Sequence, residues 1–181
     1  MGLIILVAAV VYEADRFISN KGDYNLHKTG SPAQSSLSLS SPAFAEGGDI
    51  PAKYTCKGKN ISPPLAINNV PADTKSLALI MHDPDAPAGD WLHWTVWNIE
   101  PGTNKISENS VPAGAIQGQT SFGKIGYGGP CPPSGTHHYV FTLYALDKSL
   151  DLKSGASRAE LEQAISGHDI GHTTLTGLFG S

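Results

Sequence analysis

Three aspartates and two histidines lie in the stretch MHDPDAPAGDWLHW, which runs from residue 81 to residue 94, and three of these five residues are the candidates for a shared site. These side chains, Asp83, Asp85 and His93, are of the types that bind metal ions, act as acid–base pairs, or orient one another for ligand binding. No lysine or arginine lies within the stretch. The residues alone therefore leave open a metal site, a hydrolytic site and a site where imidazoles bind an anion.

A second polar group follows the glycine- and proline-rich segment GYGGPCPPSGTHHYVF, residues 126–141. Its glycines let the backbone approach a ligand closely, and its prolines make parts of it rigid. Side chains alternate along a strand, so His137 and Tyr139 share one face and His138 takes the other. If the strands are neighbours, we expect one site that contains Asp83, Asp85, His93, His137 and Tyr139.

Three stretches are typical of buried strands: residues 75–83 (KSLALIMHD), 91–100 (WLHWTVWNIE) and 138–147 (HYVFTLYALD). They are rich in aromatic, β-branched and other apolar residues, and prolines follow the first two. None alternates cleanly between apolar and polar residues. We therefore expect both faces of each strand to be covered, as in the central sheet of a two-sheet structure.

The faces of these strands predict which side chains meet. Asp83 ends the first strand, aimed where the preceding apolar residues are aimed, and Pro84 stops the strand there. On the second strand, strict alternation places His93 on one face with Trp91, Thr95 and Trp97. A charge on His93 needs a partner in such surroundings, and Asp83 or Asp85 is the expected one.

One helix is well marked, because Ser157 and Glu160 have capping-box spacing and Gly167 follows the apolar positions. The C-terminal HTTLTGLFG is compatible with a last strand. Short strands, 20 glycines and 13 prolines predict an all-β fold with minor α content. We expect an antiparallel β-sandwich with a large central sheet and one or two short helices.

Composition limits the partners. The formal net charge of −4 and the absence of any lysine or arginine cluster argue against binding to nucleic acid or to an anionic membrane surface. The two cysteines, Cys56 and Cys131, permit one disulfide, with two buried thiols as the alternative, and they form no CxxC metal motif.

The first 36 residues are expected to lie outside the folded domain. They hold an apolar run, LIILVAAVVY, that is too short for a membrane span, followed by a polar linker. We expect residues 37–181 to form the domain and membrane contact, if any, to involve only the N-terminal segment. The apolar run leaves two locations open, the cytoplasm and export to the periplasm or beyond.

The motifs resemble a known family. DPDAP followed by WLHW, and then GYGGPCPPSGTHHY, is similar to the two signature segments of the phosphatidylethanolamine-binding proteins, also called Raf-kinase-inhibitor-like proteins. The stretches SPAFAEGGDIPAKYTCKGKNISPPL, GAIQGQTSFGKIGYGG and YVFTLYALD look like the bacterial and archaeal branch. The resemblance covers residues from about Leu37 to the C-terminus.

The resemblance implies a β-sandwich with a small surface cavity that binds phosphate-like anions without catalysis or a cofactor. On the matching positions, the ligand-binding residues are Asp83, Asp85, Trp91, His93, Gly129, Pro130, Cys131, Pro132, His137 and Tyr139. The spacer before Trp91 is short and His138 stands where an arginine is common, so we expect an open cavity that lacks one fixed charge.

We expect the aspartates to support the imidazoles, which then donate hydrogen bonds to the anion in their protonated form. Backbone N–H groups of the Gly-Pro loop and the Tyr139 hydroxyl are expected to add donors. Two alternatives stay open. One is inhibition of a protease or kinase partner, as the family name suggests, and the other is metal-assisted hydrolysis, although no nucleophile motif such as G-x-S-x-G is present.

Overall fold

The computed structural model describes residues 36–181. The strands are β1 (Ser38–Ser40), β2 (Gly48–Asp49), β3 (Leu65–Asn68), β4 (Ser76–Asp83), β5 (Trp91–Ile99), β6 (Lys105–Ile106), β7 (Ile116–Gln117), β8 (Thr136–Leu146) and β9 (Asp169–Gly180). The helices are a short 3₁₀ turn, η1 (Ala52–Tyr54), and α1 (Arg158–Ile165). The domain boundary after residue 36 stays a prediction, and the apolar segment and linker lie outside the described residues except for Ser36.

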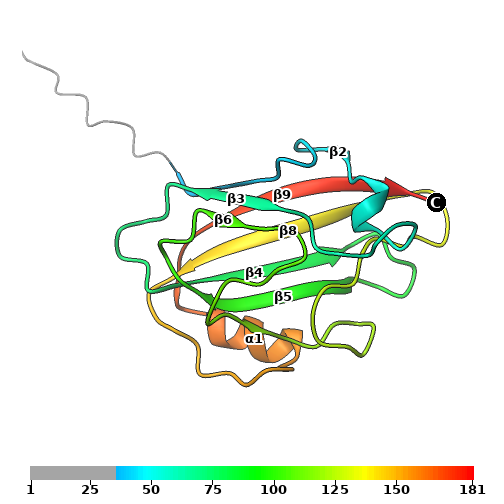
Figure 1. Ribbon diagram of the computed structural model, residues 1–181. Helices are drawn as coiled ribbons and strands as arrows, with labels where there is room; N and C mark the ends of the chain where they lie inside the picture. Colours follow the sequence, from blue (N-terminus) through cyan, green and yellow to red (C-terminus); the bar gives the residue numbers. More distant parts are fainter. Residues whose placement is uncertain (1–35) are drawn as a thin grey trace, which may run out of the picture. The chain divides into compact units, whose positions relative to one another are not determined.

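Two sheets form the described fold. The large sheet has the strand order β2-β9-β8-β4-β5-β7, and the small sheet has the order β1-β3-β6. All neighbouring strands are antiparallel except β2 and β9. Figure 1 shows the long strands β9, β8, β4 and β5 side by side, with α1 on one side of them. The predicted β-sandwich with minor helical content is confirmed.

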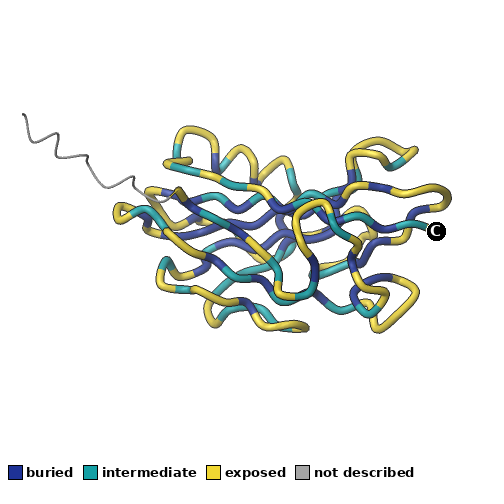
Figure 2. Tube along the Cα trace, turned by 90° about the horizontal axis from the view of Figure 1, so that it is seen from above, coloured by how far each residue is buried: buried dark blue, intermediate teal, exposed yellow. Residues whose placement is uncertain are grey.

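Two hydrophobic clusters cover the two faces of the large sheet. On one face, Leu65 and Ile67 of the small sheet pack in a cluster with Met81 and Phe141. On the other face, Leu161 and Ile165 of α1 join a cluster with Trp97 and other strand residues. Figure 2 shows buried positions along the central strands and exposed positions mainly in the connecting turns. The candidate polar residues Asp83 and His137 lie near strand ends, at the end of β4 and the start of β8.

The three predicted strands correspond to β4, β5 and β8, with ends that differ by one or two residues. Both faces of β4 and β5 are buried, as expected. In β8, by contrast, residues alternate between buried and less buried up to Ala145, because its second face is only partly covered. The expectation of two fully covered faces is therefore wrong for most of β8.

The helix and the last strand also follow their sequence signals. Ser157 is the N-cap of α1, and both hydrogen bonds of the capping box with Glu160 are present. Leu161 and Ile165 are buried at i, i+4 spacing, so α1 contacts the sheet through one face. The C-terminal residues form β9, which pairs with β8 along almost its entire length. No helix within the described part of the chain is long and apolar enough to span a membrane.

A bulge in β5 changes the faces predicted for that strand. Met81 pairs with Trp94 while His82 pairs with Leu92. His93 is therefore an extra residue of β5 that has no pairing partner on β4. As a result, Leu92 lies in the helix-side cluster although Trp94 lies in the small-sheet cluster. The His93 ring contacts Tyr139 of the small-sheet cluster, whereas Trp97 lies in the helix-side cluster. The prediction that His93 and Trp97 share a face is wrong, because strict alternation fails at the bulge.

Candidate functional site

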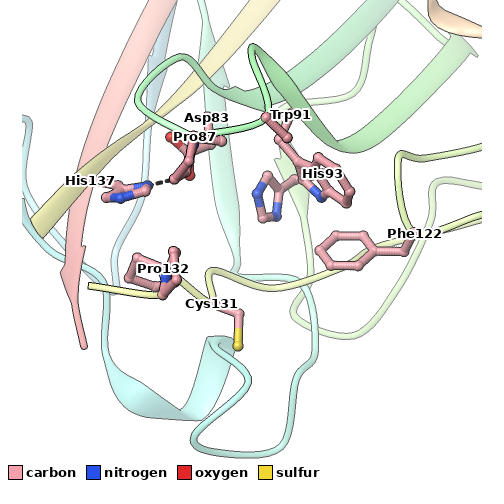
Figure 3. A pocket seen from close by; sticks show the side chains of 11 residues that line it. Asp83, Pro87, Trp91, His93, Phe122, Cys131, Pro132 and His137 are labelled. Atoms are coloured by element: carbon pink, nitrogen blue, oxygen red, sulfur yellow. Dashed lines mark hydrogen bonds and ion pairs between the residues drawn. The ribbon is translucent and has the colours of Figure 1, made fainter. Parts of the chain in front are cut away.

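A cavity of about 320 Å³ opens at the end of the large sheet where β4 ends and β5 and β8 begin. We call it the imidazole pocket, after its two buried histidines. Its lining residues are Asp83, Ala86, Pro87, Ala88, Trp91, His93, Phe122, Cys131, Pro132, Pro133 and His137. Figure 3 shows His137 and Asp83 on one side of the pocket and His93, Trp91 and Phe122 on the other.

Asp83 and His137 form a buried pair in the pocket wall. The Nδ1 atom of His137 lies 2.7 Å from Oδ2 of Asp83, and the residues are 7% and 3% exposed. The other oxygen, Oδ1, accepts the backbone N–H of Asp85 at 2.9 Å, which fixes the turn after β4. Because the carboxylate only accepts hydrogen bonds, the His137 proton is held on Nδ1 and Nε2 is left for a ligand.

His93 is held by the backbone rather than by a carboxylate. Its Nδ1 atom lies 2.6 Å from the carbonyl oxygen of Gly128, to which it must donate. Its ring makes edge contacts with Phe122 and Tyr139, at centroid distances of 5.3 and 5.1 Å. Burial lowers the pKa of His93, and the hydrogen bond to Gly128 opposes this shift only in part. The expectation that Asp83 or Asp85 orients His93 is thus corrected, although the negative charge of Asp83 still favours the charged ring.

Asp85 supports a different histidine, outside the pocket lining. Its Oδ2 atom accepts both the backbone N–H and the Nδ1–H of His138, at 2.8 and 2.7 Å. These two hydrogen bonds lower the pKa of Asp85. Asp85 therefore fixes the start of β8 on the face opposite His137, and it shapes the pocket without lining it.

The Gly-Pro loop is anchored firmly at its base. Cys131 is bridged to Cys56 by a disulfide, and the Cys56 N–H donates to the Pro130 carbonyl at 3.0 Å. The question that the sequence left open is settled in favour of the bridge. The N–H of Gly129 donates to Oδ1 of Asn60 at 2.7 Å, and the N–H of Gly128 donates to the His93 carbonyl.

These hydrogen bonds leave the loop with few free donors. Gly128 and Gly129 are already committed, and the three prolines at 130, 132 and 133 have no N–H. Only Cys131 and Pro132 of the four predicted loop residues line the pocket, whereas Gly129 and Pro130 do not. The expectation that the loop supplies several N–H donors is therefore corrected: the loop mainly provides apolar wall.

Tyr139 lies beneath the pocket and not in its lining. It is fully buried, and its hydroxyl has no hydrogen-bond partner by geometry among the described residues. Burial, followed by the negative charge of Asp83, raises the pKa of the Tyr139 phenol well above its usual value. Tyr139 is thus a neutral support for the His93 ring, and its predicted role as a donor stays a prediction.

Sequence reasoning missed several wall residues, above all Phe122. This side chain contacts both Trp91 and His93, although it comes from the connection between β7 and β8. Ala86, Pro87, Ala88 and Pro133 were also missed as individual residues, but they lie inside the quoted motifs. Phe122 had two weak signals: it is an isolated aromatic between Ser121 and Gly123 in a turn-rich segment, and it lies within the family-like stretch GAIQGQTSFGKIGYGG.

A metal centre has no matching ligand group in the described residues. No three His, Cys, Asp or Glu side chains between residues 36 and 181 are placed to hold a metal ion. His93 and His137 instead use their Nδ1 atoms for Gly128 and Asp83. What the two rings offer together is a pair of Nε2 atoms in a pocket with largely apolar walls.

Comparisons with known proteins agree with the fold and the motifs. A UPF0098 protein of the archaeon Methanothermobacter thermautotrophicus is 49% identical over 148 residues, which cover 79% of this chain and 98% of that protein. A protein of Mycobacterium tuberculosis named as a putative lipoprotein, LppC, is 44% identical over 153 residues, covering 83% of this chain and 76% of its own.

Solved structures show the same architecture. A phosphatidylethanolamine-binding protein homologue from Chlamydia trachomatis, CT736, has a TM-score of 0.78 and 41% identity, covering 81% of this chain and 98% of its own. Escherichia coli YbcL, described as a member of the mammalian family, has a TM-score of 0.77 and 31% identity, covering 81% and 99%.

The family model described as phosphatidylethanolamine-binding protein matches residues 40–180. That match spans both signature segments and every strand of the large sheet. Membership in this family supports a binding role, which agrees with a pocket lined by two imidazole rings and apolar side chains. The chain belongs to the phosphatidylethanolamine-binding protein family, in the company of bacterial and archaeal relatives.

Proposed function

We propose that the imidazole pocket binds a phosphate-like anion or a phospholigand, and that the protein is a binding protein rather than an enzyme. The observation that carries this proposal is the paired arrangement of His93 and His137. Each ring has its Nδ1 proton committed to an oxygen atom of the protein, Gly128 O or Asp83 Oδ2. Each can therefore direct only Nε2 toward a ligand.

The state of Nε2 determines what the pocket accepts. In the neutral ring Nε2 is an acceptor, and it becomes a donor when the ring takes up a second proton. An anion between the rings favours that second proton, and two charge-assisted donors then hold the anion. Asp83 stabilises this state on one side, because its carboxylate lies 2.7 Å from Nδ1 of His137.

The remaining walls fit the uncharged part of a phosphate ester. Trp91, Phe122, Pro87 and Pro132 line the pocket together with small residues, and its lining includes no lysine or arginine. Apolar walls of this kind bury carbon atoms next to the anion. Affinity for the anion alone should be modest, because no guanidinium group is available to bind it in a bidentate manner.

A cysteine nucleophile is not available in the pocket. Cys131 lies in the wall, but its sulfur is bonded to Cys56, whereas thiol chemistry requires a free thiolate. This supports the non-catalytic part of the proposal. The disulfide also favours export to an oxidising compartment, as does the similarity to a relative named as a putative lipoprotein.

A phosphate titration followed by ¹⁵N NMR tests the proposal. Backbone signals of residues 83, 93, 131 and 137 should shift and saturate together, and His93→Phe should weaken binding at least tenfold while its ring keeps the contacts with Phe122 and Tyr139. His172→Gln is the matched control, because that exposed histidine pairs with Asp169 away from the pocket. Equal affinity in His93→Phe and in the parent protein would contradict the proposal.

A further inference from the structure

A second cavity, separate from the imidazole pocket, is lined by residues of β5, β7 and three connecting loops. Its volume is about 290 Å³, and we call it the amide pocket after its three amide side chains, Asn60, Asn109 and Gln117. The other lining residues are Ile61, Ser62, Trp94, Ser110, Val111, Gly126 and Tyr127. The two cavities share no lining residue, so phosphate binding makes no use of the amide pocket.

The orientation of the Gln117 amide follows from its partner. The indole Nε1 atom of Trp94 lies 2.8 Å from Oε1 of Gln117, and an indole N–H can only donate. The amide oxygen therefore faces Trp94, which leaves both N–H groups of Nε2 without a protein partner among residues 36–181. Gln117 is thus a fixed hydrogen-bond donor in the cavity wall.

Asn60 repeats this arrangement. Its Oδ1 atom accepts the backbone N–H of Gly129 at 2.7 Å, so its Nδ2 atom keeps two N–H groups that no residue between 36 and 181 accepts. Anchoring of the Gly-Pro loop explains the position of this amide oxygen. It does not explain why two amide side chains present their NH₂ groups at one cavity.

The amide pocket also offers hydrogen-bond acceptors. The Ser110 hydroxyl donates to the Ser107 carbonyl at 2.8 Å, so its lone pairs stay open to a ligand. The backbone N–H of Asn109 donates to the Ser62 carbonyl at 3.0 Å, which holds the Asn109 turn in place, and the Asn109 side chain adds an amide group. Groups that donate and groups that accept therefore converge on the same space.

No charged side chain lines the amide pocket. Glu108 is next to Asn109 in the sequence, but it is paired with Lys53 at 2.6 Å. An ionic ligand would lose its hydration in this cavity without gaining a counter-charge. The pocket therefore favours a neutral ligand with several polar atoms.

Aromatic and aliphatic side chains make up the rest of the wall. The rings of Trp94 and Tyr127 meet edge to face at a centroid distance of 5.6 Å, and the Tyr127 hydroxyl donates to the Tyr54 carbonyl at 2.7 Å. Ile61 and Val111 add aliphatic surface. Such walls bury the carbon atoms of a ligand, and side chains that are already fixed lower the entropic cost of binding it.

We propose that the amide pocket binds one neutral sugar ring. A pyranose carries hydroxyl groups, each of which can donate and accept, around the edge of a ring whose C–H faces are apolar. The NH₂ groups of Asn60 and Gln117 donate to these hydroxyls, and the Ser110 oxygen accepts from them. The cavity is near the lower limit of about 300 Å³ for ligand sites, which suits a single ring rather than a longer segment.

Titration of the full chain with sugars, followed by ¹⁵N NMR, tests this proposal. The probes are glucose, galactose, mannose and N-acetylglucosamine, with glucuronate and glucosamine as charged counterparts. We expect at least one neutral sugar to shift the side-chain NH₂ signals of Asn60 and Gln117 and the indole signal of Trp94, and to saturate them together. The charged counterparts should bind more weakly, because the pocket offers them no counter-charge.

The methyl glycoside of the sugar that binds identifies its source. Binding of the free sugar and the glycoside with equal affinity supports the terminal residue of a glycan as the ligand. Binding of the free sugar alone supports a free monosaccharide.

The variant Asn109→Gly removes one amide and keeps the left-handed backbone at this position, where φ is 52°. We expect it to lower sugar affinity about threefold, the effect of one hydrogen bond. Asn69→Gly is the matched control, because Asn69 is also exposed, has a φ of 57° and lies outside the cavity. Sugar affinity in this control should equal that of the parent.

The variant Gln117→Met keeps the length of the side chain and removes its hydrogen-bonding groups. Sugar affinity should fall about tenfold, and Gln119→Met, at an exposed position outside the cavity, should behave as the parent. Gln117→Met leaves the Trp94 N–H unpaired, so thermal unfolding must show that it is folded. If it is not, the exposed Asn109 still decides, because its side chain supports no other described residue.

The absence of saturable shifts at Asn60, Gln117 and Trp94 with all four neutral sugars would overturn the proposal. Equal sugar affinity in the parent, Asn109→Gly and a folded Gln117→Met would do the same, since the sugar would then bind elsewhere. Tighter binding of glucuronate or glucosamine would contradict a site for neutral ligands. Sugar binding in a protein that binds no phosphate would contradict the proposed function and support the amide pocket.

Discussion

Removing the disulfide between Cys56 and Cys131 should lower the free energy of unfolding by several kilocalories per mole. The bridge joins residues 75 positions apart, so it removes many conformations from the unfolded chain. The chain-entropy relation gives about 4.5 kcal/mol for a loop of this length. Measured values usually fall below this relation, so we expect a loss between about 2 and 4.5 kcal/mol in Cys56→Ala/Cys131→Ala.

Urea unfolding followed by tryptophan fluorescence measures this loss. The parent protein treated with a reducing agent is the matched control, because it lacks the bridge but keeps both side chains. The reduced parent and the double variant should unfold at similar urea concentrations, well below the oxidised parent. A difference of less than about 1 kcal/mol between oxidised and reduced parent would refute the reasoning, since the bridge would then not restrict the unfolded chain.

The same change should weaken anion binding. Cys131 lines the imidazole pocket, and the loop that it anchors also carries the Gly128 carbonyl that holds Nδ1 of His93. We expect phosphate affinity to fall severalfold in the reduced protein under conditions where it is still folded. Unchanged affinity would show that the hydrogen bond between Gly129 and Asn60 anchors the loop by itself.

Three further substitutions test single contacts. In Asp83→Asn the side-chain oxygen keeps the hydrogen bond from the Asp85 N–H, and the amide NH₂ faces His137. The neutral His137 ring should then carry its proton on Nε2 and donate it to sulfate without taking up a second proton. The decline of sulfate affinity with rising pH should therefore be less steep, by roughly tenfold per pH unit. An unchanged pH dependence in a sulfate titration would contradict the assignment of the proton. Tyr139→Phe should change the free energy of unfolding by no more than about 1 kcal/mol, because the hydroxyl has no hydrogen-bond partner among residues 36–181; a clearly larger loss in urea unfolding would reveal one. Ser157→Ala removes the capping box of α1 and should cost about 0.5–2 kcal/mol in the same assay, with phosphate affinity unchanged.

Strand positions and the composition of the site could be predicted from local patterns. Pro84 ends β4 directly after Asp83. The glycine- and proline-rich loop ends where β8 begins, so alternation along β8 places His137 on its buried face. Asp83 and His137 indeed meet, across a separation of 54 residues. The contact follows because β4 and β8 are antiparallel neighbours, so the end of β4 lies beside the start of β8.

Other features depend on tertiary structure that no local pattern encodes. The bulge at His93 comes from a one-residue shift between β4 and β5, and it separates the ring from the carboxylates that the sequence suggested as partners. Asn60 reaches Gly129 across 69 residues, and this contact consumes a predicted anion donor. Phe122 reaches the pocket because its turn is tied to β5, which a single aromatic in a loop does not reveal.

The proton uptake that accompanies sulfate binding tests the central claim most directly. Burial lowers the pKa of His93, so the free ring loses its second proton below its usual pH, and sulfate must restore that proton on Nε2. Affinity is therefore greatest below the pKa of the free ring and falls as pH rises above it. Sulfate stays a dianion and has no proton to donate, whereas a phosphate hydroxyl can donate to a neutral Nε2.

Sulfate dissociation constants should be measured by NMR between about pH 5.5 and 8, the range in which histidines titrate. In the upper part of this range, the affinity should fall by roughly tenfold per pH unit for each ring that takes up a proton. Phosphate affinity should fall less steeply over the same range. A sulfate affinity that is independent of pH would contradict binding by protonated His93 and His137.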